Sequence, residues 1–290
     1  MDAKRNQHTI GRCATVTGFG YWTGEDVGVE FRPGAPDTGI VFVRRDMPGL
    51  PRIAAHVDSR LEGPRRTSLH AGDAVVDMVE HILAALYSLR IDNCEVWVDR
   101  PEMPGCDGSA RPFVEALDAA GILAQPAPRP TYTVTRVIRL GDDAGWIEAR
   151  PIAGALPVFC YRLDYGCSSD IPAQQYQAAL TPETFRTDIA PSRTFMLKSE
   201  ADWLLAQGFG WRATLADLLV FGPDGPLGNR LRFADECARH KTLDMIGDLA
   251  LAGCDLVGRF TAYRSGHRLN AELVRAMFAD MQPAAVRRCA

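Results

Sequence analysis

The chain shows the same order of hydrophobic and polar patterns twice. In each half, apolar residues first alternate with polar ones in short runs, as in half-buried strands, and then recur every three or four positions, as in helices packed on one face. The first half predicts a helix near Val75–Leu89, a strand at Cys94–Val98 and a helix near Pro112–Ala120. The second half predicts a helix near Ala234–Ala252, a strand at Leu256–Tyr263 and a helix near Asn270–Met281.

Spacing within the two halves also matches. His81 lies 13 positions before Cys94, and His240 lies 14 positions before Cys254. We therefore expect the two histidines to occupy corresponding places on corresponding helices of a duplicated unit.

A proline-rich stretch separates the halves. Gln125–Pro130 carries three prolines, which favours an extended linker over helix or sheet. A chain of 290 residues also exceeds one typical domain of about 100–150 residues. The sequence therefore predicts two α+β repeats, residues 1–125 and residues 130–290.

Strands precede helices in each half without strict β-α-β alternation, which predicts an α+β fold. We expect a duplicated two-domain sandwich: each half is a mainly antiparallel sheet with helices on one face, and the helices pack between the two sheets. A ligand site between the halves follows, since pockets concentrate at domain interfaces. A doubly wound α/β fold would need a glycine-rich turn before a helix. Gly18–Gly24 is glycine-rich, but no helical pattern follows it.

Composition restricts the partners. The net charge is −4 and no run of basic residues is present, so we expect no nucleic acid partner and favour a small-molecule substrate. The start of the chain lacks the apolar stretch of a signal peptide, and nowhere do 18 uncharged apolar residues run together. We therefore expect a cytoplasmic protein without stable membrane insertion.

Eight cysteines lack any Cys-x-x-Cys pair, so no disulfide framework or cysteine-type zinc site is predicted.

The helix near Ala234–Ala252 carries His240, Asp244 and Asp248 at intervals of four. At 3.6 residues per turn these side chains lie on one face, so His240 and Asp244 are able to bind one metal ion. The alternative for this spacing is a hydrogen-bonded surface pair.

The helix near Val75–Leu89 places Glu80 and His81 within an otherwise apolar run. Buried ionisable groups need partners, although a neutral core histidine beside an exposed glutamate is the alternative. If the two helices meet, His81, His240 and Asp244 supply three ligands and leave one position open, as in catalytic zinc sites. Glu80 is then a candidate general base for the attacking water.

His267 follows the predicted strand in the motif Ser265-Gly266-His267. It is a candidate general acid for the leaving amine, with Asp248 orienting its imidazole and keeping it cationic. A surface histidine that caps the next helix is the alternative.

Four motifs together resemble one enzyme family. They are Val79-Glu80-His81, Asp107-Gly108-Ser109-Ala110, His240–Asp248 and Tyr263-Arg264-Ser265-Gly266-His267. With them the sequence resembles the UDP-3-O-acyl-N-acetylglucosamine deacetylases, zinc amidohydrolases of lipid A biosynthesis, and the likeness extends over most of the chain. The resemblance implies a duplicated two-domain α+β sandwich, Zn²⁺ bound by His81, His240 and Asp244, and a general base at Glu80.

The resemblance also implies roles for further residues. Lys241 and Thr194 correspond to groups that bind the reacting carbonyl and its oxyanion, and His267 to the general acid paired with Asp248. A passage for the acyl chain is implied in an insert near residues 195–220. The stretch Trp203–Trp211 is apolar enough for that passage, with an ordinary core segment as the alternative.

Two motifs depart from the family pattern. Tyr21-Trp22-Thr23-Gly24 stands for the usual Leu-His-Thr-Gly, and Asp77-Met78 stands for the usual polar pair before Val-Glu-His. These changes predict a reshaped substrate pocket with the metal and proton-transfer residues intact. We expect a monomer that deacetylates a UDP-linked acylated glucosamine. The alternatives are a paralogue acting on another N-acylated sugar and a catalytically silent zinc- or lipid-binding regulator.

Overall fold

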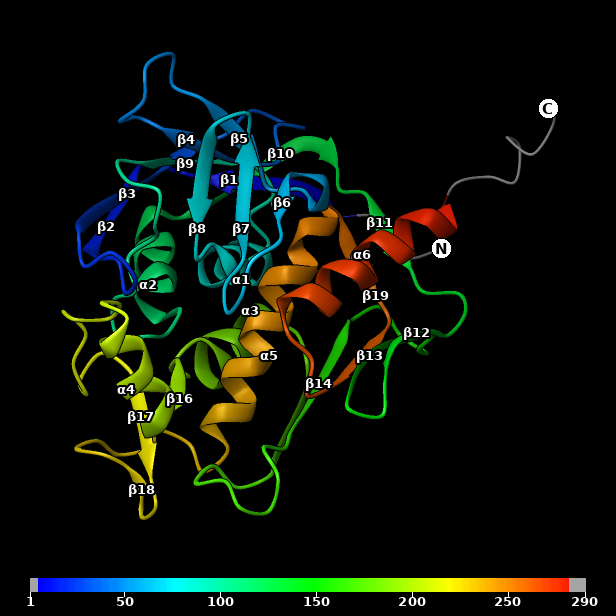
Figure 1. The fold of residues 1–290 in the computed structure, drawn as a ribbon. Coiled ribbons are helices and arrows are strands. Elements are labelled where there is room, and N and C mark those ends of the chain that lie inside the picture. Colours follow the sequence, from blue (N-terminus) through cyan, green and yellow to red (C-terminus); the bar gives the residue numbers. More distant parts are fainter. Residues whose placement is uncertain (1–4, 282–290) are drawn as a thin grey trace, which may run out of the picture.

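Two five-stranded sheets of identical topology form the framework of the computed structural model, which describes residues 5–281 (Figure 1). The outer ends of both predicted repeats, 1–4 and 282–290, lie outside the described residues. The first sheet has the order β2 (Ala14–Phe19), β3 (Asp26–Pro33), β9 (Cys94–Val98), β4 (Ile40–Arg44), β5 (Arg52–Ala54). The second has the order β12 (Ile138–Asp142), β13 (Gly145–Arg150), β20 (Arg259–Tyr263), β14 (Val158–Leu163), β15 (Gln174–Ala179).

Each of these sheets has the same pairing pattern. Strands β4 and β9 are parallel in the first sheet, β14 and β20 are parallel in the second, and the other neighbours are antiparallel. The shared order and the shared position of the parallel pair confirm the predicted duplication. The strand equivalent to β9 is β20, so Cys94 corresponds to Arg259 by register and not to Cys254. The two histidine–cysteine spacings therefore do not end at equivalent positions, and the correspondence of His81 with His240 stays a prediction.

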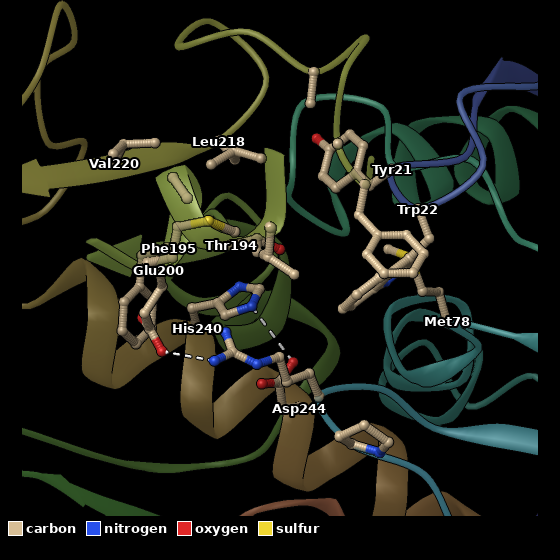
Figure 2. A pocket seen from close by; sticks show the side chains of 18 of the residues that line it. Tyr21, Trp22, Met78, Thr194, Phe195, Glu200, Leu218, Val220, His240 and Asp244 are labelled. Atoms are coloured by element: carbon tan, nitrogen blue, oxygen red, sulfur yellow. Dashed lines mark hydrogen bonds and ion pairs between the residues drawn. The ribbon is translucent and has the colours of Figure 1, made fainter. Parts of the chain in front are cut away.

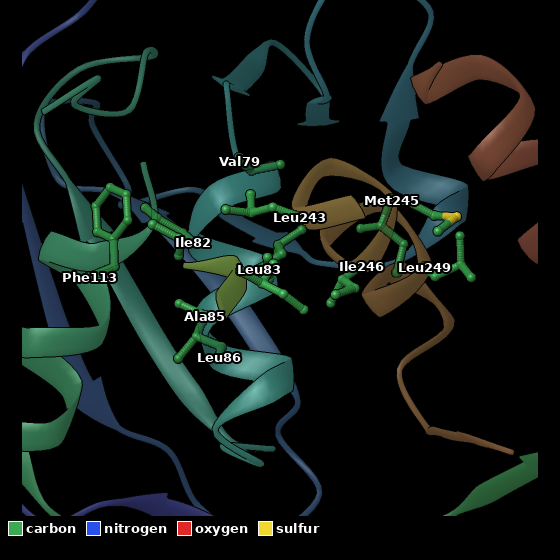
Figure 3. Close-up of a cluster of buried hydrophobic side chains, with 14 of the residues drawn as sticks. Val79, Ile82, Leu83, Ala85, Leu86, Phe113, Leu243, Met245, Ile246 and Leu249 are labelled. Carbon is green, nitrogen blue, oxygen red and sulfur yellow. The ribbon is translucent and has the colours of Figure 1, made fainter. Parts of the chain in front are cut away.

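Helices fill the space between the two sheets. Helix α2 (Arg111–Ala120) contacts the first sheet, and α5 (Glu236–Leu249) and α6 (His267–Met281) contact the second. Helix α1 (Glu80–Ser88) packs against α5, and the buried apolar cluster at this contact contains Ile82, Leu83 and Leu86 of α1 and Leu243, Ile246 and Leu249 of α5 (Figure 3). The fold is thus the expected α+β sandwich.

Helix α1 starts five residues later than predicted. Residues Ala74–Asp77 form strand β8, which pairs with β7 (Ser68–Ala71), and β7 pairs in turn with β6 (Arg60–Leu61). Met78 then adopts a left-handed conformation, with φ 61°, and this turns the chain from strand into helix within two residues. Consecutive β-branched residues at Val75 and Val76 suit a strand, and a short apolar run does not distinguish a strand from a helix by periodicity alone.

The proline-rich stretch is not a free linker. Ile122–Pro128 forms strand β10, which pairs antiparallel with β1 (Asn6–Ile10). Proline is tolerated here because β10 has only one neighbouring strand, so a ring nitrogen that lacks a hydrogen can face away from the ladder. Strand β11 (Thr131–Thr133) follows and pairs with β19 (Asp255–Val257). The division into two domains at this stretch stays a prediction.

The remaining elements lie mainly between β15 and α5. The segment 195–220 begins with β16 (Phe195–Leu197) and α4 (Lys198–Ala206) and leads into β17 (Leu219–Gly222), which pairs with β16 and with β18 (Gly225–Pro226). Short helical turns are α3 (Pro182–Thr184), η2 (Phe185–Ile189), η1 (Val57–Ser59) and η3 (Ala250–Ala252). Within residues 5–281, no helix is both long enough and apolar enough to cross a bilayer.

Candidate active site

Three side chains with metal-ligating atoms meet where α1 crosses α5 (Figure 2). Nε2 of His81 lies 3.6 Å from Oδ1 of Asp244, and Nε2 of His240 lies 3.5 Å from the same oxygen. The three ligand atoms all lie within 4.8 Å of one another. His240 and Asp244 are only 4% and 5% exposed, so the pair is not a surface pair.

The protonation of this group suits metal binding. Nδ1 of His240 lies 3.2 Å from the carbonyl oxygen of Ser192, so a proton on Nδ1 leaves Nε2 free as a ligand. Burial lowers the pKa of His240 to about 4, which keeps the ring neutral at pH 7. Burial alone would raise the pKa of Asp244, but Lys241 and His240 hold it well below its usual value.

Two neutral nitrogens and one carboxylate oxygen match the ligand set of catalytic zinc sites, which keep one position open. Among the described residues, these three form the group that could hold a metal ion. The open side of this group faces a cavity of about 1080 Å³, and all three residues line that cavity. The donor set therefore fits a divalent metal of the zinc type.

Glu80 lies beside the group on the first turn of α1 and also lines the cavity. It is only 4% exposed, which excludes the alternative of an exposed helix glutamate. Its Oε2 accepts a hydrogen bond of 3.0 Å from the backbone N–H of Thr67. Burial raises the pKa of Glu80, which brings a carboxylate towards the range useful to a general base.

His267 and Asp248 form a buried pair next to Glu80. Nδ1 of His267 donates to Oδ2 of Asp248 at 2.8 Å. Burial alone would lower the pKa of His267, but Asp248 outweighs it and raises the pKa to about 9. His267 opens helix α6 and is 8% exposed, so it is not a surface cap. The imidazole is cationic at pH 7, as an acid requires.

Lys241 and Thr194 both line the cavity. Nζ of Lys241 donates to Oδ2 of Asp244 at 2.7 Å. Burial alone would lower the pKa of Lys241, but the nearby carboxylate outweighs it and raises the pKa. The hydroxyl of Thr194 donates to the carbonyl oxygen of Gly108 at 3.1 Å. The structure thus brings all eight of the residues singled out in the sequence to one end of the cavity or directly behind it.

The other end of the cavity is built by the segment 195–220, mainly from apolar side chains, with the charged Lys198, Glu200 and Asp202 among them. Of the stretch Trp203–Trp211, the residues Leu204, Leu205, Phe209 and Gly210 line the cavity. The stretch is therefore not an ordinary core segment, because Trp203 and Trp211 are 56% and 64% exposed.

Sequence reasoning missed several residues that build the site. Thr67 is fully buried; its hydroxyl donates to Oδ1 of Asp248 at 2.5 Å and lies 3.1 Å from Nδ1 of His267. Asn270 donates to Oδ2 of Asp248 at 2.8 Å. Gly247 is a helix-interior residue at which a Cβ would lie 2.0 Å from the carbonyl oxygen of Glu80. A glycine inside an apolar helix was the one signal in the sequence that indicated close packing there.

Comparison with known proteins agrees with this geometry. The family profile described as LpxC, UDP-3-O-acyl N-acetylglycosamine deacetylase, matches residues 7–279. A protein from Brucella ovis named UDP-3-O-acyl-N-acetylglucosamine deacetylase is 39% identical over 276 residues, which cover 94% of this chain and 96% of that protein. Proteins of the same name from Brucella melitensis biotype 2 and Brucella suis biovar 1 match with the same identity and coverage. The chain belongs to the UDP-3-O-acyl N-acetylglycosamine deacetylase family.

Proposed function

We propose that the protein hydrolyses the N-acetyl group of UDP-3-O-acyl-N-acetylglucosamine, giving the free amine and acetate in lipid A biosynthesis, with Zn²⁺ held by His81, His240 and Asp244. The observation that carries the proposal is that this ligand group, a buried glutamate and the His267–Asp248 pair converge at one end of a cavity whose other end is mainly apolar. A polar sugar amide and an acyl chain on one substrate match those two ends.

His81, His240 and Asp244 would hold the metal, which would act as a Lewis acid towards a carbonyl and would lower the pKa of water. Glu80 removes a proton from the attacking water while the new C–O bond forms. Its orientation is set by the N–H of Thr67, and its raised pKa suits this transfer. Negative charge then develops on the former carbonyl oxygen.

Lys241 and Thr194 are the candidate donors to that oxygen. Lys241 is cationic and already directed at the ligand carboxylate, so the developing charge lies within reach of its ammonium group. Thr194 must rotate its hydroxyl away from the Gly108 carbonyl to donate. Its contribution therefore arises only when substrate is bound.

His267 gives its proton to the sugar nitrogen as the C–N bond breaks. The proton available for transfer is the one on Nε2, because Nδ1–H is bound to Asp248. Acetic acid, which ionises to acetate, and the neutral amine are released, and return of the proton from Glu80 to His267 restores both residues. A silent zinc- or lipid-binding regulator would have no use for a buried cationic histidine next to a buried glutamate, so these two residues favour an enzyme.

The test is mass-spectrometric detection of acetate released from UDP-linked 3-O-acyl-N-acetylglucosamine by purified, zinc-loaded protein. We expect stoichiometric acetate and free amine. Turnover of another N-acylated sugar in place of this one would identify a paralogue. Zinc and substrate binding without turnover of any such sugar would identify the regulator.

A further inference from the structure

The turn between β2 and β3 holds Trp22 with a fixed backbone. The buried carboxylate of Glu102 accepts hydrogen bonds from the N–H groups of Trp22 and Thr23, at 2.8 and 2.9 Å. Gly20 makes this possible, since a Cβ there would lie 2.3 Å from Oε2 of Glu102. Any movement of Trp22 is therefore limited to its side chain.

The indole of Trp22 is held on two sides. The guanidinium of Arg66 lies 4.6 Å from the ring centroid, in cation–π geometry, and Nε of Arg66 lies 3.6 Å from Oδ1 of Asp77. Phe209 packs against the indole in an edge-on arrangement with centroids 5.4 Å apart. Both departures from the family pattern, at Trp22 and at Asp77-Met78, thus contribute to one cluster, and Phe209 joins it to the segment 195–220.

The same turn is tied to that segment at further points. The hydroxyl of Tyr21 donates to the carbonyl oxygen of Asp217 at 2.7 Å, and Nη1 of Arg212 donates to the carbonyl oxygen of Gly24 at 3.0 Å. Trp211 covers Gly24, where a Cβ would meet its indole at 2.5 Å. The contact between Trp22 and Phe209 therefore lies where several further contacts join the β2–β3 turn to the segment 195–220.

Trp22 faces the cavity at this junction (Figure 2). Trp22, Met78 and Phe209 all line the cavity together with His81 and His240. The indole is apolar over most of its surface and rigid. It lines the cavity beside Phe209 and so borders the part of the cavity that the segment 195–220 builds.

We propose that Trp22 is a specificity-determining residue, whose indole, clamped by Arg66 and Phe209, limits the length and breadth of the acyl chain that the cavity accepts. This inference rests on the proposed function, because it takes the acyl chain of that substrate as the occupant. A side chain that cannot move aside rejects a larger group by steric overlap, whereas a mobile one would adapt.

The experiment compares kcat/KM over a series of straight and branched 3-O-acyl chains for the wild type and Trp22→Ala. We expect the ratio of kcat/KM for the longest or branched chains to that for the shortest to rise about ten-fold or more in Trp22→Ala, the usual worth of pocket shape in discrimination. Trp211→Ala is the matched control: it removes an indole from the same junction that does not line the cavity, and it should keep the wild-type preference.

Arg66→Met tests whether the cation–π contact with Arg66 holds the Trp22 indole in place. We expect it to shift acyl preference in the same direction by a smaller factor, and to add nothing in the Trp22→Ala background. The inference would be overturned if Trp22→Ala changed kcat/KM by the same factor for every acyl length. It would also be overturned if Trp211→Ala shifted the acyl preference as much as Trp22→Ala does. Thermal unfolding of each variant shows whether it is folded.

Dissociation constants for the same acyl series, measured by calorimetry, separate the two proposals. If the wild type releases no acetate but Trp22→Ala still shifts the acyl dependence of binding, the deacetylase function fails and the role of Trp22 stands. If acetate is released and Trp22→Ala leaves the acyl dependence of both binding and kcat/KM unchanged, the role of Trp22 fails alone.

Discussion

At the scale of single residues, Asp248 decides what His267 is able to do. Burial alone would leave the imidazole neutral at pH 7, and the carboxylate 2.8 Å away makes it a cation. The carboxylate is itself satisfied by Thr67 and Asn270. The proposed acid therefore depends on four side chains, of which only His267 would transfer a proton.

This arrangement predicts a pH dependence with a definite sign. His267 must be protonated to act, and its pKa is raised to about 9, so the basic limb of kcat/KM should fall as pH passes through about 9. Asp248→Asn removes the group that raises the pKa and leaves the burial that lowers it, so the basic limb should move to lower pH. The exposed pair of Asp118 with Arg186 offers a control, Asp118→Asn, which should leave the profile unchanged. An unshifted limb in Asp248→Asn would remove this pair from the mechanism.

Thr67 gives a second prediction at this scale. Thr67→Val keeps the shape and the N–H bond to Glu80 but strips Asp248 of a charged hydrogen bond, which is worth about 1.5–3 kcal/mol. We expect kcat/KM to fall by roughly 10- to 100-fold, with recovery in Thr67→Ser. Because the hydroxyl acts through His267, Thr67→Val should have little further effect in a His267→Ala background. Additive losses in the double variant would instead indicate a merely structural role.

At the scale of elements, the site depends on how closely α1 and α5 approach. Gly247 lets the carbonyl of Glu80 approach the backbone of α5, so that residues on α1 reach the ligands on α5. No side chain larger than hydrogen fits at this crossing. The apolar cluster of Figure 3 holds the two helices at that distance.

Gly247→Ala should therefore be destabilising, although alanine is the better helix former by about 1 kcal/mol. Its Cβ would overlap the backbone of Glu80, and overpacking of this kind costs about 1–3 kcal/mol. We expect a lower melting temperature and weaker zinc binding, because His81 moves away from Asp244. Thermal unfolding and metal analysis check this, and a variant more stable than the wild type with full zinc would contradict the close crossing.

The helices and strands also show which structural features could be predicted from the sequence. Spacing within one helix predicted that His240, Asp244 and Asp248 share a face, since helical geometry is local. The start of α1 was misplaced because Val75 and Val76 suit both strand and helix patterns, and the left-handed turn at Met78 has no sequence signal. Thr67 was missed because its partner Asp248 is 181 positions away, a contact that only the packing of the two repeats creates.

At the scale of the whole molecule, the proposed metal site is assembled from two copies of the same unit. His81 comes from the first repeat and His240 with Asp244 from the second. The two sheets have the same topology, but the two repeats contribute different numbers of proposed metal ligands. The first repeat supplies one and the second supplies two. Neither half holds the complete set.

We therefore expect about one tightly bound zinc per chain, lost on changing a ligand in either half to alanine, because two protein ligands remain. His81→Ala and His240→Ala should lose zinc alike, as measured by metal analysis of purified protein. His56→Ala removes a half-exposed histidine away from the group and should retain it. Stoichiometric zinc in His240→Ala would show that the ligand assignment is wrong.

The most direct test of the central claim is acetate release from UDP-3-O-acyl-N-acetylglucosamine by the zinc-loaded wild type and by Glu80→Gln, with zinc content measured on the same samples. We expect release by the wild type and a rate lower by roughly 10² to 10⁴ in Glu80→Gln, the usual worth of a positioned general base, at equal zinc content. An unaffected rate in Glu80→Gln, or no acetate from the zinc-loaded wild type, would contradict it.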